Sequence, residues 1–139
     1  MGLDQSVYLI SARKGLKDIY WKDMPKDLKE ASEFLYLRKE YAIQQFVMEL
    51  AEKKAKAMDD KERNRFDFYG AHIRLTEEDV KALYKITTPE KLREYAERWR
   101  GKLPCPYEDW EVEKVKKFCR NVLGVVALGD LAAYYASDW

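Results

Sequence analysis

The chain has 139 residues, of which 47% are hydrophobic and 14% aromatic, which is enough to bury one core and excludes a disordered chain. Its 26 basic residues nearly cancel its 25 acidic residues along the whole chain, which argues against direct binding of duplex nucleic acid unless folding assembles a basic patch. No apolar run approaches the roughly 20 residues of a membrane span, and no basic residue precedes the short N-terminal apolar run, so neither a membrane protein nor a secretory signal is predicted.

The two cysteines bear on the compartment in which the protein works. Because no export signal accompanies them, Cys105 and Cys119 are expected to be free thiols in a reducing environment. Cys119 also lies on the apolar face of a predicted helix, so we expect it in the core. The expected localisation is therefore cytoplasmic.

The first part of the chain predicts one strand, one loop and one long helix. Residues 7–10 form a continuous apolar run that is typical of a strand buried on both faces. Residues 13–30 combine Gly, Pro and alternating charges, which predicts a loop. Over residues 32–58 the apolar side chains recur at helical spacing, with Tyr36 and Ile43 on one stripe, so this segment predicts a helix.

The middle of the chain predicts a strand followed by two helices. Residues 71–75 read as a strand whose aliphatic side chains face the core. Thr76 precedes three acidic residues and is the expected N-cap of the first helix. Thr88, followed by a proline, is expected to cap the second helix, and Gly101 is expected to end it.

The last part of the chain predicts a helix over residues 107–123 and a final strand near residues 131–136. No internal repeat or linker divides the chain, so residues 1–139 are expected to form a single domain. The predicted fold class is α+β, in which a small sheet of about three strands (N-terminal, central and C-terminal) packs with about four helices.

Residues that could perform catalysis or hold a metal are few. His72 is the only histidine, and its alternation with Ile73 predicts that its side chain points away from the core. The acidic clusters at residues 77–79 and 109–113 fall in first turns of helices, where the helix dipole favours negative charge for structural reasons. No metal-binding motif and no Gly-rich phosphate loop is present. We therefore predict no catalytic residue, no metal and no cofactor, and an enzyme that uses His72 is the weakest hypothesis.

The aromatic residues are more numerous than a core of this size requires, and Tyr, Trp and Arg dominate protein interfaces. Tyr134 and Tyr135 are neighbours on the predicted last strand, so they face opposite ways, and exposure is expected for both and for Trp139. Arg38 and Lys39 lie near the start of the predicted helix, an unfavourable end for cations, which indicates an anion or acidic partner nearby. The predicted partner-binding residues are Tyr36, Arg38, Lys39, Tyr134, Tyr135 and Trp139.

Four local patches resemble a family of small proteins encoded by bacteriophages and prophages. The patches are Met1-Gly2-Leu3-Asp4, Tyr36-Leu37-Arg38-Lys39, Tyr107-Glu108-Asp109-Trp110 and the closing Tyr134-Tyr135-Ala136-Ser137-Asp138-Trp139. Members of that family open with Met-Gly-Leu-Asp and have no agreed biochemical activity. The resemblance implies a gene carried by phages and a product that acts in the cytoplasm of the bacterial host.

The chain departs from the family pattern in its second patch. Family members carry Trp, Asn and His where this chain has Leu37, Tyr41 and Gln44. A polar site that the family's Asn and His served would therefore be altered or lost here.

Two functional hypotheses follow. The first is a phage-type accessory protein that binds a host protein without catalysis, with a bacterial defence system such as CRISPR–Cas as a candidate target. The alternative is a protein that binds a nucleotide or signalling molecule, using Arg38 and Lys39 for the phosphates and nearby aromatic rings for the base.

Overall fold

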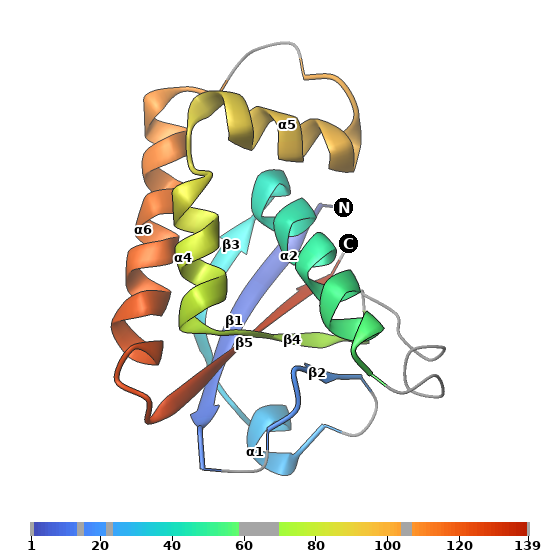
Figure 1. Cartoon of the computed structure of the whole chain (residues 1–139), viewed down its shortest axis with the longest axis vertical. Helices are drawn as coiled ribbons and strands as arrows, with labels where there is room; N and C mark the ends of the chain where they lie inside the picture. The colour runs from blue at the N-terminus through green and yellow to red at the C-terminus, as the bar shows by residue number, and fades with distance from the viewer. Residues whose placement is uncertain (1, 14–15, 22–23, 59–69, 104–106, 139) are drawn as a thin grey trace.

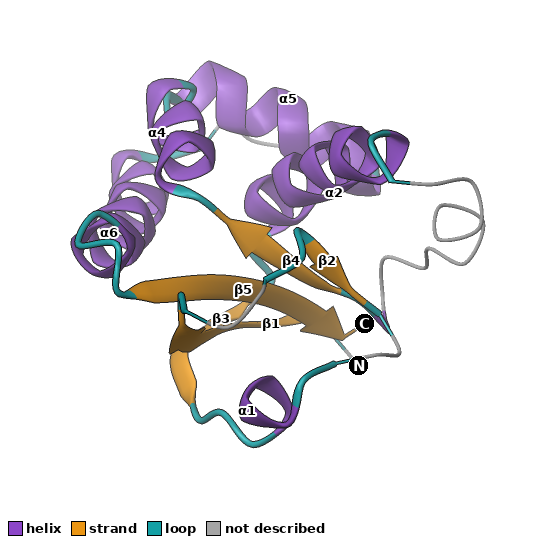
Figure 2. Cartoon of the chain, turned by 60° about the horizontal axis from the view of Figure 1, so that its bottom comes forward, coloured by secondary structure: helices purple, strands orange, loops and turns teal. Residues whose placement is uncertain are grey.

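The computed structural model describes residues 2–13, 16–21, 24–58, 70–103 and 107–138 (Figure 1). Within these residues the fold is α+β, with one antiparallel sheet of five strands in the order β2-β4-β5-β1-β3. Helices α2, α4, α5 and α6 cover one face of the sheet, and the short α1 lies on the other face (Figure 2). The elements in chain order are β1 (Asp4–Ser11), β2 (Ile19–Tyr20), α1 (Lys26–Lys29), β3 (Glu33–Arg38), α2 (Tyr41–Lys56), β4 (His72–Leu75), α4 (Glu77–Lys85), α5 (Pro89–Arg100), α6 (Asp109–Val126) and β5 (Leu131–Asp138).

Strands from the two ends of the chain form the centre of the sheet. β1 pairs with β5 over its whole length, from Asp4 opposite Asp138 to Ser11 opposite Leu131. On its other side β1 pairs with β3, with a register shift at Val7. β4 pairs with the other side of β5 and with β2. β3 is therefore an outer strand of the sheet, and β5 is an inner one.

The alternation of side chains along the strands divides the buried residues into two cores. The larger core lies between the sheet and α2, α4, α5 and α6, and it includes Val7, Ile73 and Phe118. The smaller core lies on the opposite face, where Leu28 of α1 packs with Tyr134 and three other buried residues of the strands. Because α1 is one turn long, it covers only part of that face, and no other helix of the described residues covers the rest.

A buried polar network fixes the start of α2 against the sheet. Gln5 Nε2 donates hydrogen bonds to the Tyr135 hydroxyl (2.7 Å) and the Glu40 carbonyl (2.9 Å), and Gln5 Oε1 accepts one from the Glu40 amide (2.8 Å). The Tyr135 hydroxyl donates to Gln44 Oε1, and Gln44 Nε2 donates to Ser137 Oγ at 2.9 Å. Burial raises the pKa of Tyr135, so its hydroxyl stays protonated and available as a donor. Gln44, which departs from the family pattern, thus holds a central position in this network.

Several sequence predictions are confirmed. The fold class is α+β, and residues 72–75 form a strand with its aliphatic side chains buried. Thr76 caps α4 and forms a capping box with Asp79. Thr88 caps α5, and Gly101 ends that helix at φ 94°, where a residue with a side chain would be strained. Cys119 is a free thiol buried in the core, and burial raises its pKa to about 12; Cys105 lies outside the described residues.

The predicted helix over residues 32–58 is wrong in its first third. Residues 33–38 form β3, because Leu35 and Leu37 alternate with exposed side chains and so bury one face of an extended chain rather than a helical stripe. Lys39 then adopts φ 59°, and its amide donates to the Leu3 carbonyl at 2.8 Å, which turns the chain into α2. The helix begins at Tyr41.

The predicted loop over residues 13–30 also contains regular structure, namely β2 and α1. With β2 and β3 the described residues hold five strands rather than about three, and with α1 they hold five helices rather than about four. Within the described residues, no helix combines the length and the apolar character needed to cross a membrane.

Candidate functional site: an acidic pocket on the open face of the sheet

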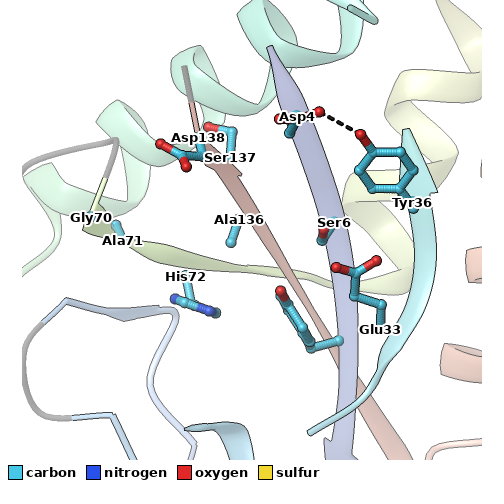
Figure 3. A pocket seen from close by; sticks show the side chains of 11 residues that line it. Asp4, Ser6, Glu33, Tyr36, Gly70, Ala71, His72, Ala136, Ser137 and Asp138 are labelled. Atoms are coloured by element: carbon cyan, nitrogen blue, oxygen red, sulfur yellow. Dashed lines mark hydrogen bonds between the residues drawn. The ribbon is translucent and has the colours of Figure 1, made fainter. Parts of the chain in front are cut away.

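The part of the sheet that α1 leaves open carries a pocket of about 410 Å³ (Figure 3). It lies on the face opposite the four large helices, and β1, β3, β4 and β5 all contribute to its walls. The residues that line it are Asp4, Ser6, Tyr8, Glu33, Tyr36, Gly70, Ala71, His72, Ala136, Ser137 and Asp138.

Small residues on the two central strands form the floor of this pocket. Ser6 of β1 lies directly opposite Ala136 of β5, and Tyr36 lies opposite Ser6 on the other side. His72 is one residue beyond the Ile73–Tyr135 pair of β4 and β5, which places it beside Ala136. The larger side chains of Tyr36 and His72 thus stand on either side of a floor of small ones, and a hollow results.

Three carboxylates give the pocket its charge. Asp4 lies opposite Asp138 across the β1–β5 pair, an arrangement of like charges that destabilises a sheet. Asp4 accepts a hydrogen bond from the Tyr36 hydroxyl and lies 4.0 Å from Arg38 Nε. Among the described residues, Glu33 and Asp138 have neither a hydrogen-bond partner nor an ion-pair partner for their side chains. Two of the three negative charges are therefore available to a ligand.

Tyr36 is hydrogen-bonded to one of these carboxylates, that of Asp4. Its hydrogen bond to Asp4 raises the pKa of the Tyr36 hydroxyl, because the phenol donates that bond only while it is protonated. The side chain is nevertheless 54% exposed, and Phe34 on the same outer strand is 37% exposed. β3 thus presents aromatic surface beside the carboxylates.

His72 is half-buried at the edge of the pocket, with its ring centroid 5.6 Å from that of Tyr8. Among the described residues, its Nδ1 atom is buried without a hydrogen-bond partner. Burial lowers the pKa of His72 below its usual 6.5, so the imidazole is neutral at pH 7. No described carboxylate and no described hydroxyl group forms a hydrogen bond with this nitrogen.

The depressed pKa of His72 predicts a pH-dependent stability. The unfolded chain binds the proton at a pKa near 6.5 and the folded chain only at a lower pH, so the free energy of unfolding should fall as the pH drops below about 6.5. Urea unfolding at pH 7.5, 6.5 and 5.5 would measure how the free energy of unfolding changes with pH. In the His72→Gln variant, the decrease in this free energy between pH 6.5 and 5.5 should be smaller. An unchanged decrease in that variant would assign the dependence to the carboxylates instead.

The structure brings together only part of the predicted partner-binding set. Tyr36 lines the pocket, and Arg38 lies beside Asp4. Lys39 follows β3 in a turn, so the premise that it and Arg38 begin a helix is wrong. Trp139 lies outside the described residues.

The predicted exposure of Tyr134 and Tyr135 is wrong, since both side chains are 0% exposed. β5 is an inner strand with both faces covered at this point: Tyr135 packs under the large helices and Tyr134 packs with α1. The two rings do face opposite ways, as predicted, but each faces a core.

Sequence reasoning missed the carboxylates that define the site. In the sequence, Asp4, Gln5 and Ser6 form a run of three polar residues, so no alternation marks Asp4 and Ser6 as one face of a strand. The alternation appears only in the structure, where Gln5 is buried. The approach of Glu33 and Asp138 likewise depends on the strand order.

Comparison of the chain with protein-family models, with curated proteins and with solved structures finds no match. The chemistry of the pocket is therefore interpreted from its own residues. Unpartnered carboxylates, hydroxyl groups and aromatic rings form a surface that attracts positive charge and repels anions. Among the described residues, no group of three metal-ligating side chains lies close enough to hold an ion.

Proposed function

We propose that the protein acts by binding another protein without catalysis, and that the open sheet face around the pocket is the contact surface. The observation that carries this proposal is that exposed aromatic side chains of the outer strand β3 lie beside the unpartnered carboxylates of Glu33 and Asp138. Aromatic residues are enriched in protein interfaces, and complementary charge sets the orientation of the partner. The local resemblance to the phage family makes a bacterial host protein the expected partner, and a component of a defence system such as CRISPR–Cas is one candidate.

The nucleotide hypothesis receives less support from the same geometry. Arg38, which would hold a phosphate, lies beside Asp4. A phosphate placed there would face the carboxylates of Asp4 and Asp138, which lie opposite each other on β1 and β5, and like charges repel. A positively charged partner surface suits this pocket better than an anionic ligand.

Affinity capture from bacterial lysate with paired variants tests the proposal. The wild-type protein should retain a stoichiometric protein that survives nuclease treatment. Tyr36→Ala should reduce that retention at least about tenfold, because an exposed aromatic residue at an interface is a typical binding hot spot. Tyr84→Ala is the matched control, since Tyr84 is 43% exposed on α4, which covers the other face of the sheet.

Two results would contradict the proposal. One is a partner that binds Tyr36→Ala as well as it binds the wild type. The other is the absence of any retained protein combined with a rise in melting temperature when a nucleotide is added. Circular dichroism should establish that Tyr36→Ala is folded before either result is interpreted.

A further inference from the structure

Resting on the proposed function, the geometry points to a more specific ligand: we propose that the pocket receives an arginine side chain of the partner protein. The first argument is charge. Of the eleven described residues that line the pocket, three are acidic and none is Lys or Arg. Within the described part of the chain, Arg38 forms an ion pair with only one of the three carboxylates, that of Asp4. The neutral imidazole of His72 adds no positive charge to oppose a cation.

The second argument is the placement of the acceptors. Figure 3 shows the carboxylate of Glu33 on one side of Ser6 and Ala136 and that of Asp138 on the other, where Asp4 lies opposite Asp138. A guanidinium group carries five N–H donors in a planar fork and can serve several acceptors at once, whereas an ammonium group is a compact point charge. Ser6 offers a hydroxyl acceptor between the carboxylates.

The third argument is the shape of the walls. Tyr8, Tyr36 and His72 surround the small floor residues with planar rings. Arginine stacks on such rings, and its side chain is more weakly hydrated than that of lysine. Its transfer from water into the pocket therefore costs less desolvation free energy. A divalent cation fits less well, because no three ligating groups converge within the described residues. The volume of about 410 Å³ is ample for one long side chain.

An NMR titration of the full chain tests this inference with blocked amino acids as probes. N-acetyl-arginine amide should shift the backbone amide signals of Ser6, His72 and Ala136 in a saturable way. The lysine analogue should bind at least about threefold more weakly, because it lacks the planar fork, and the neutral citrulline analogue should give no saturable shift.

Charge variants complete the test. Glu33→Gln combined with Asp138→Asn should weaken arginine binding at least about tenfold, because it removes both unpartnered charges. Glu52→Gln combined with Glu90→Gln removes the same charge from exposed helix positions and should leave binding unchanged. Equal binding of arginine and citrulline, equal binding of arginine and lysine, or no shift at the pocket with any probe would each overturn the inference.

The inference and the proposed function can fail separately. Tyr36→Ala could abolish capture of a partner while the arginine probe does not bind. That result would support the proposed contact surface and contradict arginine as the ligand of the pocket. The arginine probe could instead bind the pocket while capture is insensitive to Tyr36→Ala. That result would support the pocket as an arginine site and contradict the proposed contact surface.

Discussion

Replacing Tyr135 with phenylalanine should lower the free energy of unfolding by about 3 kcal/mol, although the change removes a single oxygen. The Tyr135 hydroxyl accepts a bond from Gln5 and donates one to Gln44, and all three side chains are fully buried. Without it, one donor of Gln5 and one acceptor of Gln44 remain unpaired in the core, and each such group costs about 1–3 kcal/mol. Urea unfolding of the variant and the wild type measures the difference.

Tyr134→Phe is the matched control, because it makes the same chemical change at the neighbouring residue. The Tyr134 hydroxyl donates a bond to the Lys17 carbonyl at 2.6 Å and also interacts with the Tyr20 side chain, in the smaller core and only partly buried at this bond. We expect a loss of about 1 kcal/mol there, because water can reach part of this site. Equal losses for the two variants would show that the network around Gln5 contributes no more than the bonds of Tyr134.

Filling the pocket with an aliphatic side chain should weaken partner binding strongly without changing any charge. In Ala136→Leu the added carbons would occupy the floor between Ser6 and His72, where the proposed arginine must enter. We expect affinity for the captured partner to fall at least about 30-fold, the loss of about 2 kcal/mol that defines a hot spot. Isothermal titration of the purified pair measures this change.

Ala82→Leu controls for the added hydrophobic surface. Ala82 is exposed on α4, which covers the opposite face of the sheet, so the same carbons are added far from the pocket. Its affinity should equal that of the wild type. If Ala136→Leu binds normally while remaining folded, the partner does not enter the pocket.

The predictions that succeeded were those that local sequence determines. Thr76 caps a helix because its hydroxyl accepts from the Asp79 amide three residues later, and Gly101 ends one because it tolerates a positive φ. The predicted helix over residues 32–58 was wrong before Lys39 because its evidence was also local. Tyr36 and Ile43 are seven residues apart and fit one helical stripe, and only the pairing of residues 33–38 with β1 shows that Tyr36 belongs to a strand.

Less of the candidate site could be predicted from the sequence, because the site depends on the order of the strands in the sheet. The predicted exposure of Tyr134 and Tyr135 assumes that a strand near the end of the sequence is peripheral, yet β5 lies between β4 and β1. The same order brings Asp138 opposite Asp4. Neither the burial of the tyrosines nor the meeting of the carboxylates follows from any local pattern, since both depend on contacts between residues more than a hundred positions apart.

The position of β5 has a consequence for how the protein is made. Among the described strands, β5 is the one that joins two separate pairs, β1 with β3 and β2 with β4. Until residues 131–138 are available, β1 and β4 each lack a neighbour on the side where β5 pairs, and an unpaired edge is the kind of surface that recruits other chains. We therefore expect a chain shortened before residue 131 to aggregate.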